Sequence, residues 1–313
     1  MKRASLIIHP SELTKKWVDR IADNKIPTLA IHPEGGKQAY EHIGKLLDLL
    51  DSEQYRELLD YGAGRGLNIE YEMHAARFLL PESEFLSHPE WFRMNREGKR
   101  TTDFNLCASS DEAIAMVAEN AAALVKKLYR STNRYFLWLD DSKDAFCHCP
   151  SCSKMSASDQ QMKILNAIIK RIREDNPEAT LAYLAYCETI EAPRDVAAEE
   201  GIFLEYAPFC RDFHRPLSED GECAHLGGLL DFFDKDSAKA LDYWYDNSLF
   251  SKWKKPPVFF EVDRAVMEAD IEFYRQLGFA DVSAFACFLG DDYEELHGEV
   301  DVSDFGRLVA QKN

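Results

Sequence analysis

The chain has 313 residues, a formal net charge of −18 and an apolar content of 46%. This acidic balance argues against a nucleic acid or an anionic membrane surface as partner, because both bind through clustered lysine and arginine. The sequence has no run of about 20 apolar residues that could span a bilayer. Its first ten residues lack the apolar core of a signal peptide, so we expect a cytoplasmic protein.

Short β-rich runs alternate with amphipathic stretches along the whole chain, which predicts a parallel sheet with helical crossovers. We expect eight strands, at 6–8, 28–32, 68–74, 134–140, 180–186, 202–207, 238–245 and 281–287. We expect helices between them, at 11–23, 37–62, 110–128, 156–175, 189–199, 222–235 and 263–278. This alternation indicates an α/β protein with a (β/α)8 TIM barrel. Since no linker or internal repeat divides the sequence, one domain over 1–313 is expected.

The loop after the third predicted strand, residues 75–109, is unusually long for a compact domain. It carries His88-Pro89, Trp91-Phe92 and a basic run at 96–100. Two interpretations are open. The loop either forms part of a substrate wall or packs as a lid without touching a ligand.

In (β/α)8 barrels the chemistry takes place at the carboxyl ends of the strands. Each predicted strand here ends in a charged group or an aromatic hydrogen-bonding group, which indicates an enzyme-like face. Side-chain alternation could instead send Trp244 into the helix layer. The candidate substrate contacts are His9, His32, His74, Tyr206, Arg211, His214, Tyr243, Trp244, Asp246 and Asp291.

Two adjacent carboxylates, Asp140 and Asp141, end the fourth predicted strand. Carboxylates this close disfavour joint ionisation, which raises one pKa and leaves a proton donor near neutral pH. A catalytic role for at least one of them is therefore predicted. The alternative is that one caps the next turn or pairs with Lys143.

A cysteine motif, Cys147-x-Cys149-x-x-Cys152, follows at once and supplies three thiolates with metal-ligand spacing. Cys107 is expected to be the fourth ligand, with His148 as a possible substitute. Four thiolates without an open position make a structural zinc site, whereas the alternative is a loop of reduced cysteines. The glycines at 62–66 follow a predicted helix and precede a strand, the reverse of a cofactor-binding turn, so no organic cofactor is expected.

The chain resembles a known family through three motifs, which are His88-Pro89-Glu90-Trp91-Phe92, Leu106-Cys107 and the cysteine motif. Over roughly residues 68–290 it is similar to the domain-of-unknown-function family 4838, regarded as carbohydrate-active barrels related to α-glucuronidases and hexosaminidases. The cysteines are also similar to the structural zinc site of family 42 β-galactosidases, whose acid/base residue ends strand four. The resemblance implies a glycoside hydrolase whose partner is a small-molecule carbohydrate.

The Asp-Asp pair also resembles the dyad of substrate-assisted hexosaminidases. This likeness implies that Asp141 is the general acid and that Asp140 holds the 2-acetamido group of the sugar. Two other functions remain open. One is a carbohydrate-binding barrel without catalysis, and the other is a divalent-metal sugar isomerase or epimerase that uses His9, His32, His74 and Glu34. The sequence does not indicate an oligomeric state.

Overall fold

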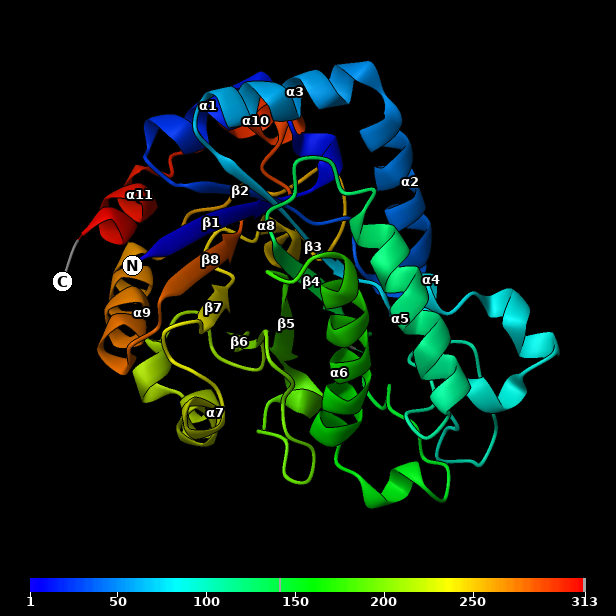
Figure 1. Ribbon diagram of the computed structural model, residues 1–313. Coiled ribbons are helices and arrows are strands. Elements are labelled where there is room, and N and C mark those ends of the chain that lie inside the picture. The colour runs from blue at the N-terminus through cyan, green and yellow to red at the C-terminus, as the bar shows by residue number, and fades with distance from the viewer. Residues whose placement is uncertain (141, 312–313) are drawn as a thin grey trace. The chain divides into compact units, whose positions relative to one another are not determined.

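The computed structural model describes residues 1–140 and 142–311, and its eight parallel strands form a closed barrel in the order β1 to β8 (Figure 1). The strands are β1 (Arg3–Ile8), β2 (Thr28–Ile31), β3 (Asn68–His74), β4 (Arg134–Trp138), β5 (Thr180–Ala185), β6 (Ile202–Tyr206), β7 (Lys239–Asp242) and β8 (Asp281–Phe285). The prediction of a (β/α)8 barrel is confirmed. Each predicted strand overlaps an observed one.

The helices surround the barrel strands, as expected for this fold. They are α1 (Lys15–Asp23), α2 (Ala39–Asp51), α3 (Glu53–Gly64), α4 (Ala76–Leu79), α5 (Asp111–Val125), α6 (Ala157–Asp175), α7 (Leu226–Phe232), α8 (Asn247–Phe250), α9 (Arg264–Leu277), α10 (Asp291–His297) and α11 (Ser303–Ala310).

Two helix predictions need correction. The stretch 37–62 is not one helix, because the Ser52 side chain accepts the Tyr55 N–H and begins α3 as a new helix. The helix predicted at 189–199 is wrong. Instead, the Asp159 carboxylate accepts the backbone N–H groups of 194, 195 and 196 at 2.9–3.1 Å, so this segment satisfies its backbone without helical hydrogen bonds.

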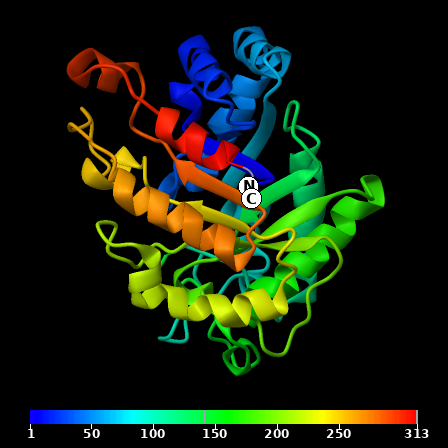
Figure 2. The same ribbon diagram turned by 90° about the vertical axis from the view of Figure 1, so that its left-hand side faces the viewer.

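The chain divides into two compact units, which we describe separately. Unit 1 comprises Met1–His32, Ser52–Glu70 and Glu205–Asn313, and unit 2 comprises Pro33–Asp51 and Tyr71–Leu204. In unit 1, β1 pairs with both β2 and β8, and β7 pairs with β6 and β8. The helices α9 and α11 lie side by side in this unit (Figure 2). In unit 2, β4 pairs with β3 and β5, and α5 packs against α6.

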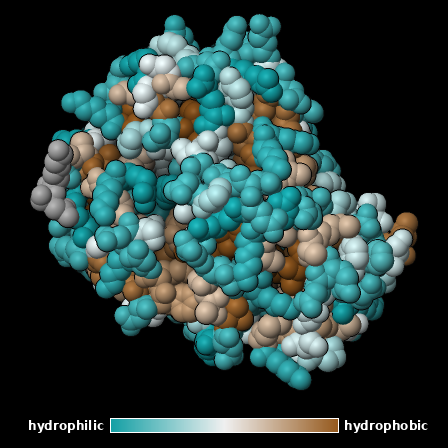
Figure 3. Space-filling model, viewed as in Figure 1, coloured by the Kyte–Doolittle hydropathy of each residue, from teal (hydrophilic) through white to brown (hydrophobic). Residues whose placement is uncertain are grey.

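The strands are buried on both faces, as parallel strands inside a helical layer are. The face shown in Figure 3 is dominated by hydrophilic side chains, in keeping with a charged fraction of 29%. Among the residues that the structure describes, no helix combines the length and the apolar character needed to cross a membrane.

Candidate functional site

The carboxyl end of β4 presents Asp140, whose backbone is clamped from both sides by one side chain. Asp140 N donates to Asn105 Oδ1 at 2.7 Å, and Asn105 Nδ2 donates to Asp140 O at 3.2 Å. Asn105 is 1% exposed, so water does not compete for these bonds. Asn105 therefore fixes the position at which the chain leaves β4. Asp141, the predicted general acid, lies outside the described residues.

A predicted contact and a small hollow lie near this strand end in unit 2. His74, the last residue of β3, places Nδ1 2.8 Å from the carbonyl oxygen of Leu139, which can only accept, so Nδ1 carries the proton. A hollow of about 20 Å³ borders Asp140, Tyr186 and Glu188. That volume holds roughly one water molecule and not a sugar ring.

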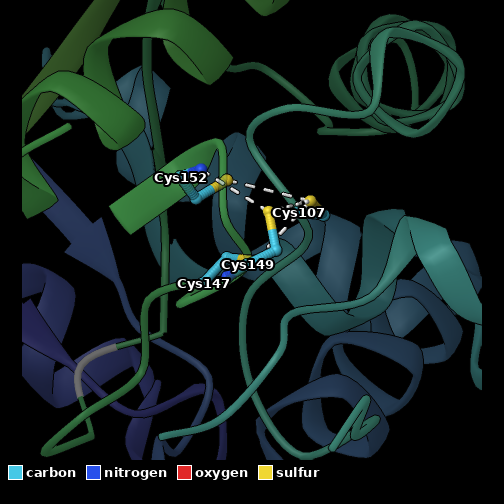
Figure 4. A group of neighbouring side chains, drawn as sticks. All are labelled: Cys107, Cys147, Cys149 and Cys152. Carbon is cyan, nitrogen blue, oxygen red and sulfur yellow. Dashed lines mark hydrogen bonds between the residues drawn. The ribbon is translucent and has the colours of Figure 1, made fainter. Parts of the chain in front are cut away.

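The four predicted metal ligands come together in a single cluster (Figure 4). Cys107 arrives from the segment before α5, whereas Cys147, Cys149 and Cys152 lie on the loop after β4. The Cys107 sulfur is 3.5, 3.7 and 3.8 Å from the sulfurs of Cys147, Cys149 and Cys152. A tetrahedral zinc site with Zn–S bonds of about 2.3 Å has sulfur–sulfur edges of about 3.8 Å. The spacing fits zinc.

Backbone and side-chain groups surround these sulfurs as they surround thiolates at a metal. Met94 N donates to Cys147 Sγ at 3.3 Å, and Cys152 N donates to Cys149 Sγ at 3.5 Å. Gln160, which is buried, binds the backbone N–H and the carbonyl of Cys147 and the carbonyl of Cys152. The loop is thus held in the conformation that directs its thiols inward.

The thiols also perturb one another. Hydrogen bonds from Cys147 and Cys152 lower the pKa of Cys107, and contact with Cys107 raises the pKa of Cys147 to about 11. His148 lies outside the four-cysteine cluster, and its Nε2 is 2.7 Å from Asp144 Oδ1. Four thiolates at these distances would repel one another unless a cation lay between them.

A second cluster, in unit 1, forms where β1, β7 and β8 end. His9 follows β1 and places Nδ1 2.9 Å from the carbonyl oxygen of His32. Glu12 accepts the His9 N–H and the Leu289 N–H, each at 3.1 Å. Burial raises the pKa of Glu12, against the opposing effect of His9. Asp246 accepts the N–H and the hydroxyl of Ser248, and burial raises its pKa to about 6.

Three predicted sugar contacts are buried and bind other side chains or the backbone of the protein. The buried Arg211 guanidinium is 3.2 Å from Asp242 and 2.7 Å from Asp270, and the Trp244 indole N–H donates to Asp270 at 3.0 Å. Trp244 therefore lies against α9 in the helix layer. Tyr206 is also fully buried, and its hydroxyl donates to the Glu222 carbonyl at 3.0 Å.

Of the remaining predicted contacts, some are buried and others are exposed to solvent. Tyr243 is 6% exposed and stacks on Phe285 with ring centroids 5.5 Å apart. The His32 ring meets Phe285 edge-on at 5.1 Å. His214 and Asp291 are exposed, His214 on the loop after β6 and Asp291 at the start of α10.

Sequence reasoning missed Asn105, Glu12 and the placement of Cys287. Asn105 stands two residues before Cys107, and Glu12 stands three residues after His9, so each lies close to a residue that the sequence did single out. Cys287 ends the eighth predicted strand. The structure brings its sulfur within 4.8 Å of ligand atoms of His9 and Glu12.

Comparison with known proteins identifies one family model and many solved structures that match the chain. The family model described as "Domain of unknown function (DUF4838)" matches residues 45–286. A comparison with curated protein sequences finds no match. Many solved structures share the fold.

Three of these structures are similar over nearly the whole chain. One is ZgEngAGH5_4 in complex with cellotriose (13% identity, 96% of this chain and 88% of that chain, TM-score 0.53). Another is a glycoside hydrolase family 5 enzyme from Prevotella bryantii B14 with a xyloglucan tetradecasaccharide (9%, 95% and 85%, TM-score 0.53). A third is the endo-beta-N-acetylglucosaminidase from Cordyceps militaris (11%, 98% and 90%, TM-score 0.50). At these identities the likeness establishes the fold alone.

Proposed function

The chain belongs to the DUF4838 family, and we propose that it is a glycoside hydrolase with Asp141 as general acid and Asp140 as its partner. Its substrate is a small oligosaccharide or glycoside. The barrel fold is shared with enzymes whose structures hold cellotriose and a xyloglucan oligosaccharide, which supports a carbohydrate ligand.

One observation carries the proposal, the rigid mounting of Asp140 at the carboxyl end of β4. A general acid acts only when it is held within hydrogen-bond reach of the leaving oxygen. The two hydrogen bonds from buried Asn105 fix the backbone of Asp140. Asp141 follows Asp140 directly in the sequence.

The two carboxylates have different protonation states in this proposal: Asp141 is protonated and Asp140 is ionised. Protonation of one carboxyl is favoured when its neighbour is ionised, which keeps a proton available near neutral pH. In our proposal ionised Asp140 orients the 2-acetamido group, whose oxygen attacks the anomeric carbon. The glycosidic C–O bond breaks in the same step, and Asp141 gives its proton to the leaving oxygen. Water then opens the resulting oxazoline and returns a proton to Asp141. This route needs no second carboxylate as nucleophile, in contrast with an enzyme that forms a covalent intermediate.

We also propose that Cys107, Cys147, Cys149 and Cys152 hold a structural zinc ion. The sulfur spacing and the N–H groups directed at the sulfurs support this assignment. Cys107 lies two residues after Asn105, so the metal would anchor the segment that clamps Asp140. Four thiolates would fill all four coordination positions of the metal, which would leave none for substrate and give the metal a structural role.

The test is hydrolysis of a panel of aryl glycosides that includes the N-acetylglucosaminide, the galactoside and the glucuronide. Wild type, Asp141→Asn and Asp140→Asn are compared with Asp48→Asn, which removes an exposed carboxylate on α2. We expect turnover of one glycoside, a loss of roughly 10²–10⁴-fold in Asp141→Asn, and no change in Asp48→Asn.

Two results would contradict the proposal. One is equal activity in wild type and Asp141→Asn. The other is no turnover of any glycoside by folded, zinc-containing protein. Sugar binding without turnover would favour the non-catalytic carbohydrate-binding barrel.

A further inference from the structure

The strand register of unit 1 brings three different metal-ligating side chains to one place. β1 and β8 pair in parallel with Ile7 opposite Phe285, and the Ala286 N–H continues the ladder to the Ile7 carbonyl at 2.7 Å. His9 and Cys287 each stand two residues beyond the paired positions. The turn at Pro10–Glu12 then returns Glu12 toward them. One ligand atom from each of His9, Glu12 and Cys287 lies within 4.8 Å of the other two.

We propose that His9, Glu12 and Cys287 form a second metal site, for zinc or a similar divalent transition metal, separate from the four-cysteine cluster. The set offers one nitrogen, one oxygen and one sulfur. Mixed donors of this kind suit zinc or cobalt, whereas magnesium and calcium prefer oxygen alone. The site is independent of the proposed glycosidase activity.

Two of the three donors are already oriented for a metal by groups behind them. His9 Nδ1 donates a hydrogen bond to the His32 carbonyl, which leaves the Nε2 lone pair as the ligand. The two Glu12 oxygens accept one backbone N–H each, from His9 and Leu289, and each keeps a second lone pair. A metal with bonds of about 2.0–2.3 Å would draw the three ligand atoms to separations of about 3.3–3.6 Å.

Charge also favours a cation here. Glu12 is 5% exposed and Cys287 1%, and the Asp246 carboxylate, 6% exposed, interacts electrostatically with both His9 and Glu12. Apart from His9, whose ring is neutral when its Nε2 is a ligand, the cationic side chain that acts on Glu12 is Lys255. Lys255 is itself paired with Asp292 at 2.6 Å. Buried carboxylates are costly without a compensating charge, and a divalent ion would supply it.

Three protein ligands leave one coordination position of a tetrahedral site for water. This arrangement differs from the four-cysteine cluster, in which sulfur fills every position. The two sites should therefore differ in spectrum and in metal affinity.

The experiment is titration of metal-stripped, full-length protein with Co²⁺, followed by absorption and by metal analysis after dialysis. Four variants separate the sites: His9→Gln and Cys287→Ser in the proposed site, Cys149→Ser in the cysteine cluster, and Cys223→Ser as a half-buried thiol outside both. Circular dichroism and thermal melting establish that each variant is folded.

We expect wild type and Cys223→Ser to bind two equivalents of Co²⁺. His9→Gln and Cys287→Ser should each lose one equivalent and keep the intense tetrathiolate spectrum. Cys149→Ser should lose that spectrum and retain the equivalent that depends on His9.

The proposal is overturned if His9→Gln binds as much metal as wild type, whatever Cys149→Ser does. His9 follows β1 and Cys287 follows β8, so if one variant fails to fold, the other still tests the proposal. A protein that loses all its metal in Cys149→Ser and none in His9→Gln would have the cysteine site alone.

Discussion

Removing Cys107 tests whether the four-cysteine cluster is a metal crosslink. Cys107 lies 40 residues before Cys147, so a shared metal closes a loop of that length. Closing such a loop removes chain entropy from the unfolded state worth about 4 kcal/mol at 25 °C, by analogy with a disulfide of the same span. For a chain of this length the corresponding loss in melting temperature is about 6 °C.

The assay is differential scanning calorimetry of Cys107→Ser beside Cys210→Ser, which replaces an exposed thiol outside the cluster. Zinc content is measured on the same samples. We expect Cys107→Ser to lose the zinc of the four-cysteine cluster and to melt several degrees lower, and Cys210→Ser to match wild type. A strong chelator should lower the melting temperature of wild type by at least that amount and should have a smaller effect on Cys107→Ser. Wild-type protein that contains no zinc, or that melts at the same temperature with and without chelator, would refute the reasoning.

Three further predictions concern the clamp, the buried ion network and a tight helix contact. Asn105→Ala should lower kcat by up to about 100-fold with a smaller change in KM, because it releases the backbone of Asp140 and misplaces the acid; steady-state kinetics with equal losses in binding and turnover would argue against a positioning role. Burial raises the pKa of Asp242 to about 6, although Arg211 opposes the shift. The folded chain therefore holds this proton to higher pH than the unfolded chain, and the stability it contributes below about pH 4 is lost as the pH rises to 6, by at most about 3 kcal/mol. In Asp242→Asn the free energy of unfolding should change less between pH 4 and pH 6 than in wild type. In Asp231→Asn, which replaces an exposed carboxylate, it should change with pH as in wild type. A Cβ at Gly306 of α11 would lie 2.2 Å from the Asn24 carbonyl oxygen, so Gly306→Ala should lower the free energy of unfolding by about 1–3 kcal/mol. Gly228 on α7 has open space around it, so Gly228→Ala should be neutral or slightly stabilising. Unfolding by denaturant measures both effects.

The barrel could be predicted because its strands are short, continuously apolar runs separated by amphipathic stretches. The boundaries of the helices were harder to predict than the barrel. The break at Ser52 had a local signal, since Asp51-Ser52-Glu53 is typical of a helix N-terminus. The false helix at 189–199 had none, because its backbone is satisfied by Asp159, about 35 residues earlier.

Part of the candidate site could also be predicted from local sequence, and part could not. The spacing of Cys147, Cys149 and Cys152 is local, so it could be recognised, and Cys107 could be added from its place before a helix. Arg211 and Trp244 looked like sugar contacts because they follow strand ends. Their direction is decided by Asp270 on α9, about 59 and 26 residues away, and no nearby residue signals that contact. Long-range ion pairs of this kind depend on the folded arrangement and not on local pattern.

The most direct test of the central claim is how the loss in Asp141→Asn depends on the leaving group. Glycosides of one sugar are prepared with phenols of increasing acidity, and kcat/KM is compared for wild type and variant. A general acid matters least when the leaving phenol is already acidic. We predict a loss of roughly 10²–10⁴-fold for the phenyl glycoside that shrinks toward unity for the dinitrophenyl glycoside. The same loss for every leaving group would contradict the assignment of Asp141 as the acid.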